Sequence, residues 1–174
     1  MDTIIRKLTD SPEDEDIYQQ AAQIICRGGL VAFPTETVYG LGADGMSEDA
    51  ARKIYAAKGR PTDNPLILHI ADRKDLERIT DKVTEDADKL MTCFWPGPLT
   101  LIFEKRKEVP YGITGGLETV AVRMPAHPAI RELIRRSGTA IAAPSANTSG
   151  RPSPTMAEHV WEDMAGKIDM LIDG

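Results

Sequence analysis

The stretch FPTETVYGLG, residues Phe33 to Gly42, decides the fold of this chain. It completes the apolar run of residues 30–33, which is typical of a buried β-strand. Pro34 then ends that strand, because proline has no backbone N–H to donate. Polar side chains directly after a buried strand are where open α/β sheets bind ligands. A ligand-binding loop and a plain turn with capping threonines are both open interpretations of this one segment. Its polar side chains are Thr35, Glu36, Thr37 and Tyr39.

The composition is that of one globular domain with a proper hydrophobic core. The chain has 174 residues, of which 41% are hydrophobic and 28% are charged. Its net charge of -6 argues against general attraction to nucleic acids or anionic membranes, so any polyanion needs a local basic cluster. No apolar run reaches the roughly 18 residues of a membrane span, and the N-terminal MDTIIRKLTD lacks a signal-peptide core. We expect a cytoplasmic protein without membrane contact.

The cysteines and histidines give no sign of a metal site. Cys26 and Cys93 fall within predicted helices, where we expect buried free thiols in a reducing compartment. The histidines are far apart and lack the spacing of zinc ligands, so we expect no protein-bound metal. They are His69, His127 and His159.

Patterns of apolar residues, prolines, glycines and capping residues predict the secondary structure. Strands are expected at residues 3–8, 30–33, 66–71, 99–103, 119–123, 140–143 and 168–172. Helices are expected to begin at Ser11-Pro12, Ser47, residues 72–74, Thr84, His127 and a capping box of Thr155 with Glu158. The strands at 99–103 and 119–123 have no predicted helix between them. This favours a mixed α/β sheet over a strict βαβ repeat.

Five polar segments share one design, in which a proline or glycine fixes the backbone beside a few functional side chains. They are PTETVYG, KGRPTDNP, TVAVRMP, APSAN and SGRPSPT. None matches a P-loop, a dinucleotide fingerprint or a nucleophile elbow. Together they predict a concave site with fixed cations and small hydroxyls, suited to a small anionic ligand such as a nucleotide and a small polar co-substrate.

Each of the key residues also has a purely structural interpretation. Lys58 and Arg60 follow a helix, and cations are favoured at a helix C-terminus. Arg123 ends the run TVAVR, so it is either a solvated arginine on an edge strand or the partner of an anion. His69 interrupts an apolar strand and is equally well explained as a satisfied core histidine.

The ordered segments FPTETVYGLG, KGRPTDNPL, WPGPLT, TVAVRMPAHP and APSANTSGRPSPT resemble the YrdC family of threonylcarbamoyl-AMP synthases. The resemblance covers residues 24–174. It implies a twisted mixed α/β sheet with flanking helices around a large concave basic cavity. It also implies a nucleotidyltransferase that forms L-threonylcarbamoyladenylate and pyrophosphate from L-threonine, bicarbonate and ATP, with Mg²⁺. That reaction begins the synthesis of N6-threonylcarbamoyladenosine in tRNA, so later tRNA-modifying enzymes are implied partners.

The resemblance also assigns residues to ligands and names no catalytic base. By similarity, the L-threonine site would comprise Thr37, His69, Arg123 and the backbone at Ala143. By similarity, the ATP site would comprise Lys58, Arg60, Asn64, Thr119, Ser145 and Ser153, with Lys58 adding charge at the phosphates.

The chain departs from the family pattern at its C-terminus. Family members continue past the final predicted strand into a glycine-rich turn and further ligand contacts, so we expect residues 1–174 to be a YrdC-like domain lacking its C-terminal part. Two other functions stay open. One is a module that binds double-stranded RNA or tRNA without turnover, which the acidic net charge disfavours. The other is a carbamoyl-transfer domain of a maturation enzyme, whose usual zinc-finger and acylphosphatase regions are not visible here.

Overall fold

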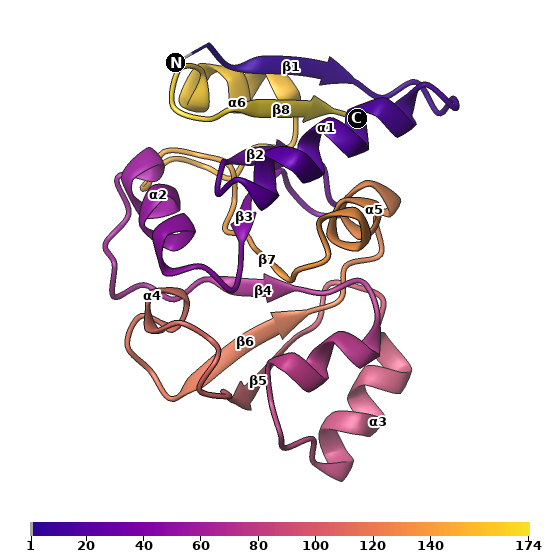
Figure 1. Ribbon diagram of the computed structural model, residues 1–174, viewed down its shortest axis with the longest axis vertical. Coiled ribbons are helices and arrows are strands. Elements are labelled where there is room, and N and C mark those ends of the chain that lie inside the picture. Colours follow the sequence, from indigo (N-terminus) through magenta and orange to yellow (C-terminus); the bar gives the residue numbers. More distant parts are fainter. Residues whose placement is uncertain (1) are drawn as a thin grey trace.

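One mixed β-sheet of eight strands runs through the whole molecule, as the computed structural model of residues 2–174 shows (Figure 1). The strands are β1 (Ile4–Lys7), β2 (Val31–Phe33), β3 (Gly40–Asp44), β4 (Ile67–His69), β5 (Thr100–Glu104), β6 (Thr119–Arg123), β7 (Ile141–Ala142) and β8 (Met170–Asp173). Their order across the sheet is β1-β8-β2-β3-β7-β4-β6-β5. The pairs β1/β8, β2/β8 and β4/β6 are parallel, and the other four pairs are antiparallel. The predicted mixed α/β sheet is therefore confirmed.

The helices begin and end largely where capping chemistry predicts. They are α1 (Asp14–Cys26), α2 (Glu48–Lys58), α3 (Glu85–Phe94), α4 (Tyr111–Thr114), α5 (Pro128–Ser137) and α6 (Ala157–Met164), with a 3₁₀ helix at Arg73–Arg78. Ser47 caps α2 and Thr84 caps α3, each accepting a main-chain N–H at 3.2 Å. Gly59 ends α2 with a φ of 62°, a left-handed conformation that favours glycine. No helix within residues 2–174 is long and apolar enough to cross a membrane.

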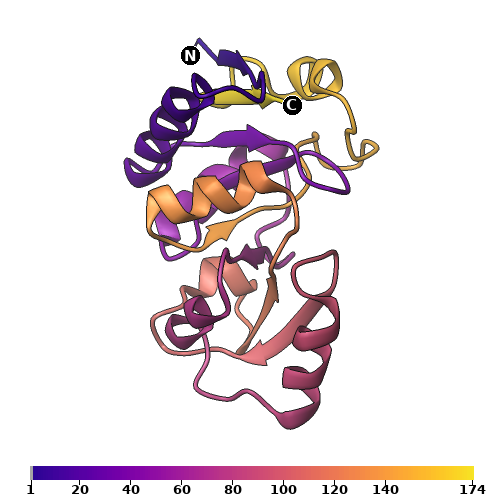
Figure 2. The same ribbon diagram turned by 90° about the vertical axis from the view of Figure 1, so that its right-hand side faces the viewer.

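The two faces of the sheet are covered differently. One face packs α1 and α5 against β2, β7 and β8 and buries Val31, Phe33, Ile141 and Met170. The other face buries Leu41, Leu68, Val120 and Val122 against α2, α3, α4 and α6. Seen from the side, the molecule is elongated, with the indigo and yellow strands β1 and β8 at one end and the dark pink α3 and β5 at the other (Figure 2). The helical layer of α1 and α5 stops short of β6 and β5, where Ile102 is 72% exposed. We call this side of the sheet the open face, and the side that buries Leu41 and Leu68 the closed face.

Strand β3 is an element that sequence patterns did not predict. Its glycines are typical of a turn, but they are needed for packing. A Cβ atom at Gly40 or Gly42 would lie 2.8 Å or 2.5 Å from the ring of Phe33. Glycine therefore makes room for the aromatic ring of the neighbouring strand.

Two predicted helix starts and the burial of the cysteines are wrong. Helix α1 begins at Asp14, three residues after Ser11, and its N-cap is Glu13, which makes no side-chain capping bond. The Asp14 carboxylate instead accepts the N–H groups of residues 9 and 10 in the preceding turn. The capping box of Thr155 with Glu158 does not form, and α6 begins at Ala157. Both cysteines are exposed. Cys26 lies in the last turn of α1, and Cys93 lies on a helix that buries only one residue fully.

Replacement of Leu68 by alanine should destabilise the protein, because its side chain is fully buried on the closed face of β4. We expect a loss of about 2–5 kcal/mol in the free energy of unfolding. The matched control is Ile102→Ala on the open face, which should change that free energy by less than about 0.5 kcal/mol. Urea unfolding followed by circular dichroism measures both. Equal losses in the two variants would contradict the assignment of the faces.

Candidate functional site

The open face of β4, β6 and β5 carries three of the predicted site residues, and we call it the floor of the site. They are His69, Thr119 and Arg123. The register pairs His69 with Arg123 and Arg123 with Thr100, so these three side chains share one row. At the other end of β6, Thr119 lies opposite Glu104. Parallel pairing and the two-residue repeat of a strand therefore put both ends of the site on one surface, about 13 Å apart.

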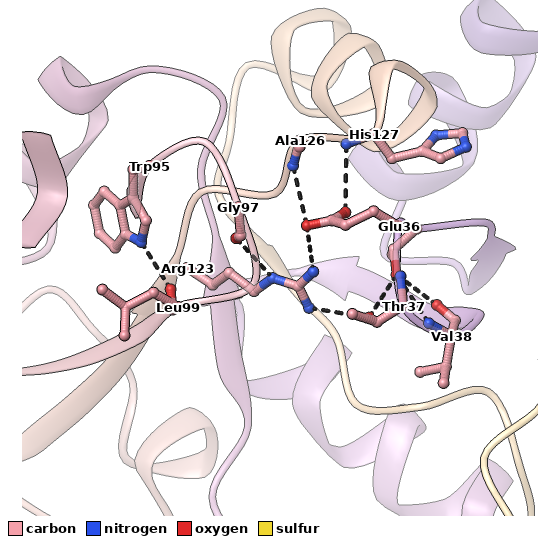
Figure 3. Close-up of polar contacts among 10 residues, drawn as sticks. Glu36, Thr37, Val38, Trp95, Gly97, Leu99, Arg123, Ala126 and His127 are labelled. Carbon is pink, nitrogen blue, oxygen red and sulfur yellow. Dashed lines mark hydrogen bonds and ion pairs between the residues drawn. The ribbon is translucent and has the colours of Figure 1, made fainter. Parts of the chain in front are cut away.

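Arg123 is held at the end of β6 by three acceptors from two segments (Figure 3). Its Nε donates to the Gly97 carbonyl at 3.2 Å, its Nη1 to Thr37 Oγ1 at 3.4 Å, and its Nη2 to Glu36 Oε1 at 2.5 Å. Only 11% of its side chain is exposed. The solvated edge-strand interpretation of Arg123 is therefore wrong, and its ion-pair partner is a carboxylate of the protein.

The loop after β2 is ordered by one hydroxyl. Thr35 Oγ1 accepts the N–H groups of Thr37 and Val38, both at 3.2 Å, and donates to the Val38 carbonyl at 2.6 Å. Such side-chain turns hold a tight loop without regular secondary structure. The loop places Thr37 beside Arg123.

His69 is buried at the same end of the floor. Its Nδ1 lies 3.2 Å from the Ile67 carbonyl. The same carbonyl also accepts the main-chain N–H of Ala143 at 3.0 Å. Burial lowers the pKa of His69 to about 4, and the nearby Arg123 guanidinium lowers it in the same direction. The imidazole is therefore neutral at neutral pH.

The opposite end of the floor is built around Arg60. Its Nη2 donates to Asn64 Oδ1 at 2.8 Å and to the Pro65 carbonyl at 2.9 Å, and its Nε donates to the Asn64 carbonyl at 3.2 Å. Pro65 leads into β4, and Thr119 begins the neighbouring parallel strand β6. Arg60, Asn64 and Thr119 thus gather near the N-terminal ends of these two strands.

Lys58 is turned inward and is only 2% exposed. Its ammonium group donates to the carbonyls of Ser145 and Asn147, the latter at 2.5 Å, and its own carbonyl accepts the N–H of Ser149. Burial, and to a smaller extent the nearby Arg60 guanidinium, lower the pKa of Lys58 to about 8. Lys58 therefore holds the segment at 145–149 in place by hydrogen bonds. It also lies two residues before Arg60 in the chain.

The segment at 144–154 closes against the loop after β2. The N–H of Tyr39 donates to the Pro154 carbonyl, and the N–H of Ala146 donates to the Tyr39 carbonyl, both at 2.8 Å. Ser145 forms an isolated bridge with Gly40, whereas Ser153 lies exposed on the same segment. Register places His69, Thr119 and Arg123 on the floor, and hydrogen bonds tie Lys58 to the segment at 145–149 and Thr37 to Arg123.

Two polar residues of these segments were not assigned to L-threonine or to ATP by the family resemblance. Glu36 stands in the first motif, but nothing in the local pattern shows that it pairs with an arginine 87 positions away. Asn147 is buried with its Oδ1 atom unpartnered, while its Nδ2 donates to the carbonyls of Thr148 and Arg151. A buried acceptor without a donor among residues 2–174 is unusual in a folded protein.

Comparison with known proteins identifies the family. The Sua5_yciO_yrdC family model, described as "Telomere recombination", matches residues 23–174. The chain belongs to the Sua5/YciO/YrdC family. Among curated members of this family, the threonylcarbamoyl-AMP synthase of Pyrococcus abyssi is 56% identical over 172 residues, which cover 99% of this chain and 50% of the relative. That of Bacillus subtilis is 58% identical over 156 residues, covering 89% of this chain and 45% of the relative.

Solved family structures share the fold. A crystal structure of P. abyssi Sua5 complexed with L-threonine matches all of this chain and 50% of its own with a TM-score of 0.93 at 53% identity. Escherichia coli YciO matches 99% of this chain and 84% of its own with a TM-score of 0.86, and at 24% identity this likeness concerns the fold alone. The chain spans about half the length of the first curated relatives that it matches.

The buried neutral His69 should make stability depend on pH. Its folded-state pKa of about 4 lies below the ordinary 6.5, so the unfolded chain binds more protons between these values and stability falls as the pH falls. The loss should reach about 2 kcal/mol between pH 7.5 and pH 5. Urea unfolding at both pH values measures it.

The His69→Gln variant should lose this part of the pH dependence, whatever its stability at pH 7.5. The matched control, His159→Gln at an exposed position, should keep the wild-type dependence. If His69→Gln and wild type changed in parallel, His69 would not be the group that resists protonation.

Proposed function

We propose that this domain forms L-threonylcarbamoyladenylate and pyrophosphate from L-threonine, bicarbonate and ATP. The observation that carries the proposal is the two-ended floor. A fixed guanidinium, Arg123, stands at one end, and the Arg60 and Asn64 donors stand at the other. An amino acid and a nucleotide can then lie on the same rigid surface with their reacting groups meeting between the ends. The names of the curated relatives agree with this activity.

The amino-acid end offers chemistry that suits a small hydroxy amino acid. Guanidinium N–H groups of Arg123 suit a carboxylate. The hydroxyl of Thr37 and the neutral imidazole of His69 both donate and accept hydrogen bonds, which suits an amine or a hydroxyl. The backbone at Ala143 adds to the same end of the floor. Of the solved relatives, P. abyssi Sua5 has been crystallised with L-threonine.

The nucleotide end would act by charge and position. The threonine carbamate attacks the α-phosphate of ATP as pyrophosphate leaves, and both events move negative charge onto oxygens. Fixed cations stabilise such charge without forming a covalent intermediate. We assign Arg60 and Lys58 to the phosphates, and Asn64, Thr119, Ser145 and Ser153 to the rest of ATP. The site needs no general base among these residues.

Mg²⁺ would enter this reaction bound to ATP. Among residues 2–174, no group of three or more His, Cys, Asp or Glu side chains is placed to hold a metal ion. Magnesium commonly binds through substrate phosphates with few protein ligands, so the phosphates of ATP would carry it to the Arg60 end. The product would pass to enzymes that modify tRNA, which we propose as the downstream partners.

Omission of single substrates should decide the reaction class. With ATP, L-threonine and bicarbonate present, pyrophosphate release should exceed the level measured without threonine or without bicarbonate by at least tenfold, that is about 1.4 kcal/mol in effective barrier. A coupled pyrophosphate assay measures it. Pyrophosphate release that is the same without threonine and without bicarbonate would indicate simple ATP hydrolysis. Absence of release together with salt-sensitive binding of double-stranded RNA would favour the RNA-binding alternative.

Arg60→Ala should lower pyrophosphate release at least about 100-fold, because it removes a fixed cation from the phosphates. Its unfolding temperature should stay near that of the wild type. Arg52→Ala is the matched control, since Arg52 is exposed on α2, the helix that precedes Arg60, and pairs with Asp49. Wild-type turnover by the Arg60 variant would contradict the phosphate role of this residue.

A further inference from the structure

Among residues 2–174, Glu36 is the side chain that forms an ion pair with Arg123, and it belongs to the loop that also carries Thr37. We propose that Glu36 is a positioning residue that fixes the Arg123 guanidinium for a ligand carboxylate and makes this end of the site disfavour an amino acid with a second carboxylate in its side chain. The ligand part of this inference rests on the proposed function, whereas the positioning part rests on geometry alone.

The Glu36 carboxylate is anchored independently of the arginine. Its Oε1 accepts the N–H of Ala126 at 3.1 Å, and its Oε2 accepts the N–H of His127 at 3.4 Å (Figure 3). His127 is the N-cap of α5, so the carboxylate lies at a helix N-terminus, where negative charge is stabilised. Main-chain donors therefore fix the carboxylate, and the carboxylate in turn fixes Arg123.

The remaining contacts of Arg123 complete the fixation. The Gly97 carbonyl that accepts from Nε is itself held, because the N–H of Gly97 donates to Met124 and the indole of Trp95 donates to the Leu99 carbonyl. An arginine has five N–H donors. Three of them meet Gly97, Thr37 and Glu36, which leaves two for a ligand.

Fixation before binding raises affinity. An arginine loses much rotamer freedom when it is immobilised, and here that loss occurs on folding instead of on binding. A free arginine at the end of a strand would have to be ordered by each ligand. We therefore expect about a tenfold loss of carboxylate affinity when the positioning contact is removed.

The charge of Glu36 also limits what can bind. Burial acts to raise the pKa of Glu36, but the hydrogen bonds from Arg123 and from the main chain outweigh it and leave the pKa below its ordinary value. The carboxylate is ionised at neutral pH and offsets the positive charge of Arg123. A single α-carboxylate suits this balanced pair, whereas a carboxylate in the amino-acid side chain would be repelled. The carbamate of the proposed reaction forms on the amine and reacts between the two ends of the floor, away from Glu36.

A competing explanation is that Glu36 only ties the loop to α5. Three variants separate the two roles: Glu36→Ala removes the contact, Glu36→Gln keeps an oxygen acceptor without charge, and Arg123→Lys removes the fork that Glu36 orients. Calorimetric binding of L-threonine, L-aspartate and ATP to the full 174-residue chain measures the effects. Glu85→Ala, at an exposed carboxylate on α3, is the matched control.

Positioning predicts a specific pattern. Glu36→Ala should weaken L-threonine binding about tenfold and leave ATP binding unchanged, whereas Glu36→Gln should stay within about threefold of the wild type and narrow the preference for L-threonine over L-aspartate. In the Arg123→Lys background, Glu36→Ala should add less than about twofold, because coupled residues are not additive. Equal losses in both backgrounds, or unchanged affinity in Glu36→Ala, would overturn the inference.

A second measurement needs no ligand. The side-chain Nε–H signal of Arg123 in ¹⁵N NMR spectra should be sharp and slowly exchanging in the wild type and in Glu85→Ala, and broadened in Glu36→Ala. An unchanged signal in Glu36→Ala would overturn the positioning role. If the wild type failed to bind L-threonine, the proposed function and the ligand selection would both be overturned, while the NMR result would still decide whether Glu36 positions Arg123.

Discussion

The packing of the Phe33 ring against two glycines is the constraint on which the rest of the structure depends. Phe33 pairs with Gly40 across β2 and β3, and its ring fills the space above Gly40 and Gly42. This contact holds β2 against β3 with six residues between them, and it thereby fixes the position of the polar loop that connects the two strands. Through that loop, the core of the protein determines where Glu36 meets Arg123.

Much of the fold follows from local patterns, and the exceptions have physical causes. Seven of the eight strands and the caps of α2 and α3 could be predicted, because apolar runs and hydroxyl caps act over a few residues. Strand β3 could not be predicted, because its glycines are required by the packing of an aromatic ring seven to nine positions earlier. The exposure of Cys93 could not either, because it depends on how little of α3 the sheet covers.

The site divides in the same way. Sequence motifs indicated the segments that contribute to the candidate site, and they left Arg123 as either a solvated arginine or the partner of an anion. They could not show that this anion is Glu36, or that Lys58 turns inward to grip two carbonyls, because both contacts join residues more than 80 positions apart. Local patterns predict where functional side chains begin, whereas tertiary contacts decide which way they point.

The register of β6 has a consequence for how this domain can change. Thr119 and Arg123 lie on the open face because they are four residues apart, an even number of steps along a strand. Loss or gain of one residue between them would turn one of the two side chains toward Leu68 and the closed face. The spacing of Thr119 and Arg123 along β6 must therefore stay even if both side chains are to lie on the open face. Val120 and Val122 of the same strand are buried on the closed face, so neither these side chains nor the length of β6 can vary freely.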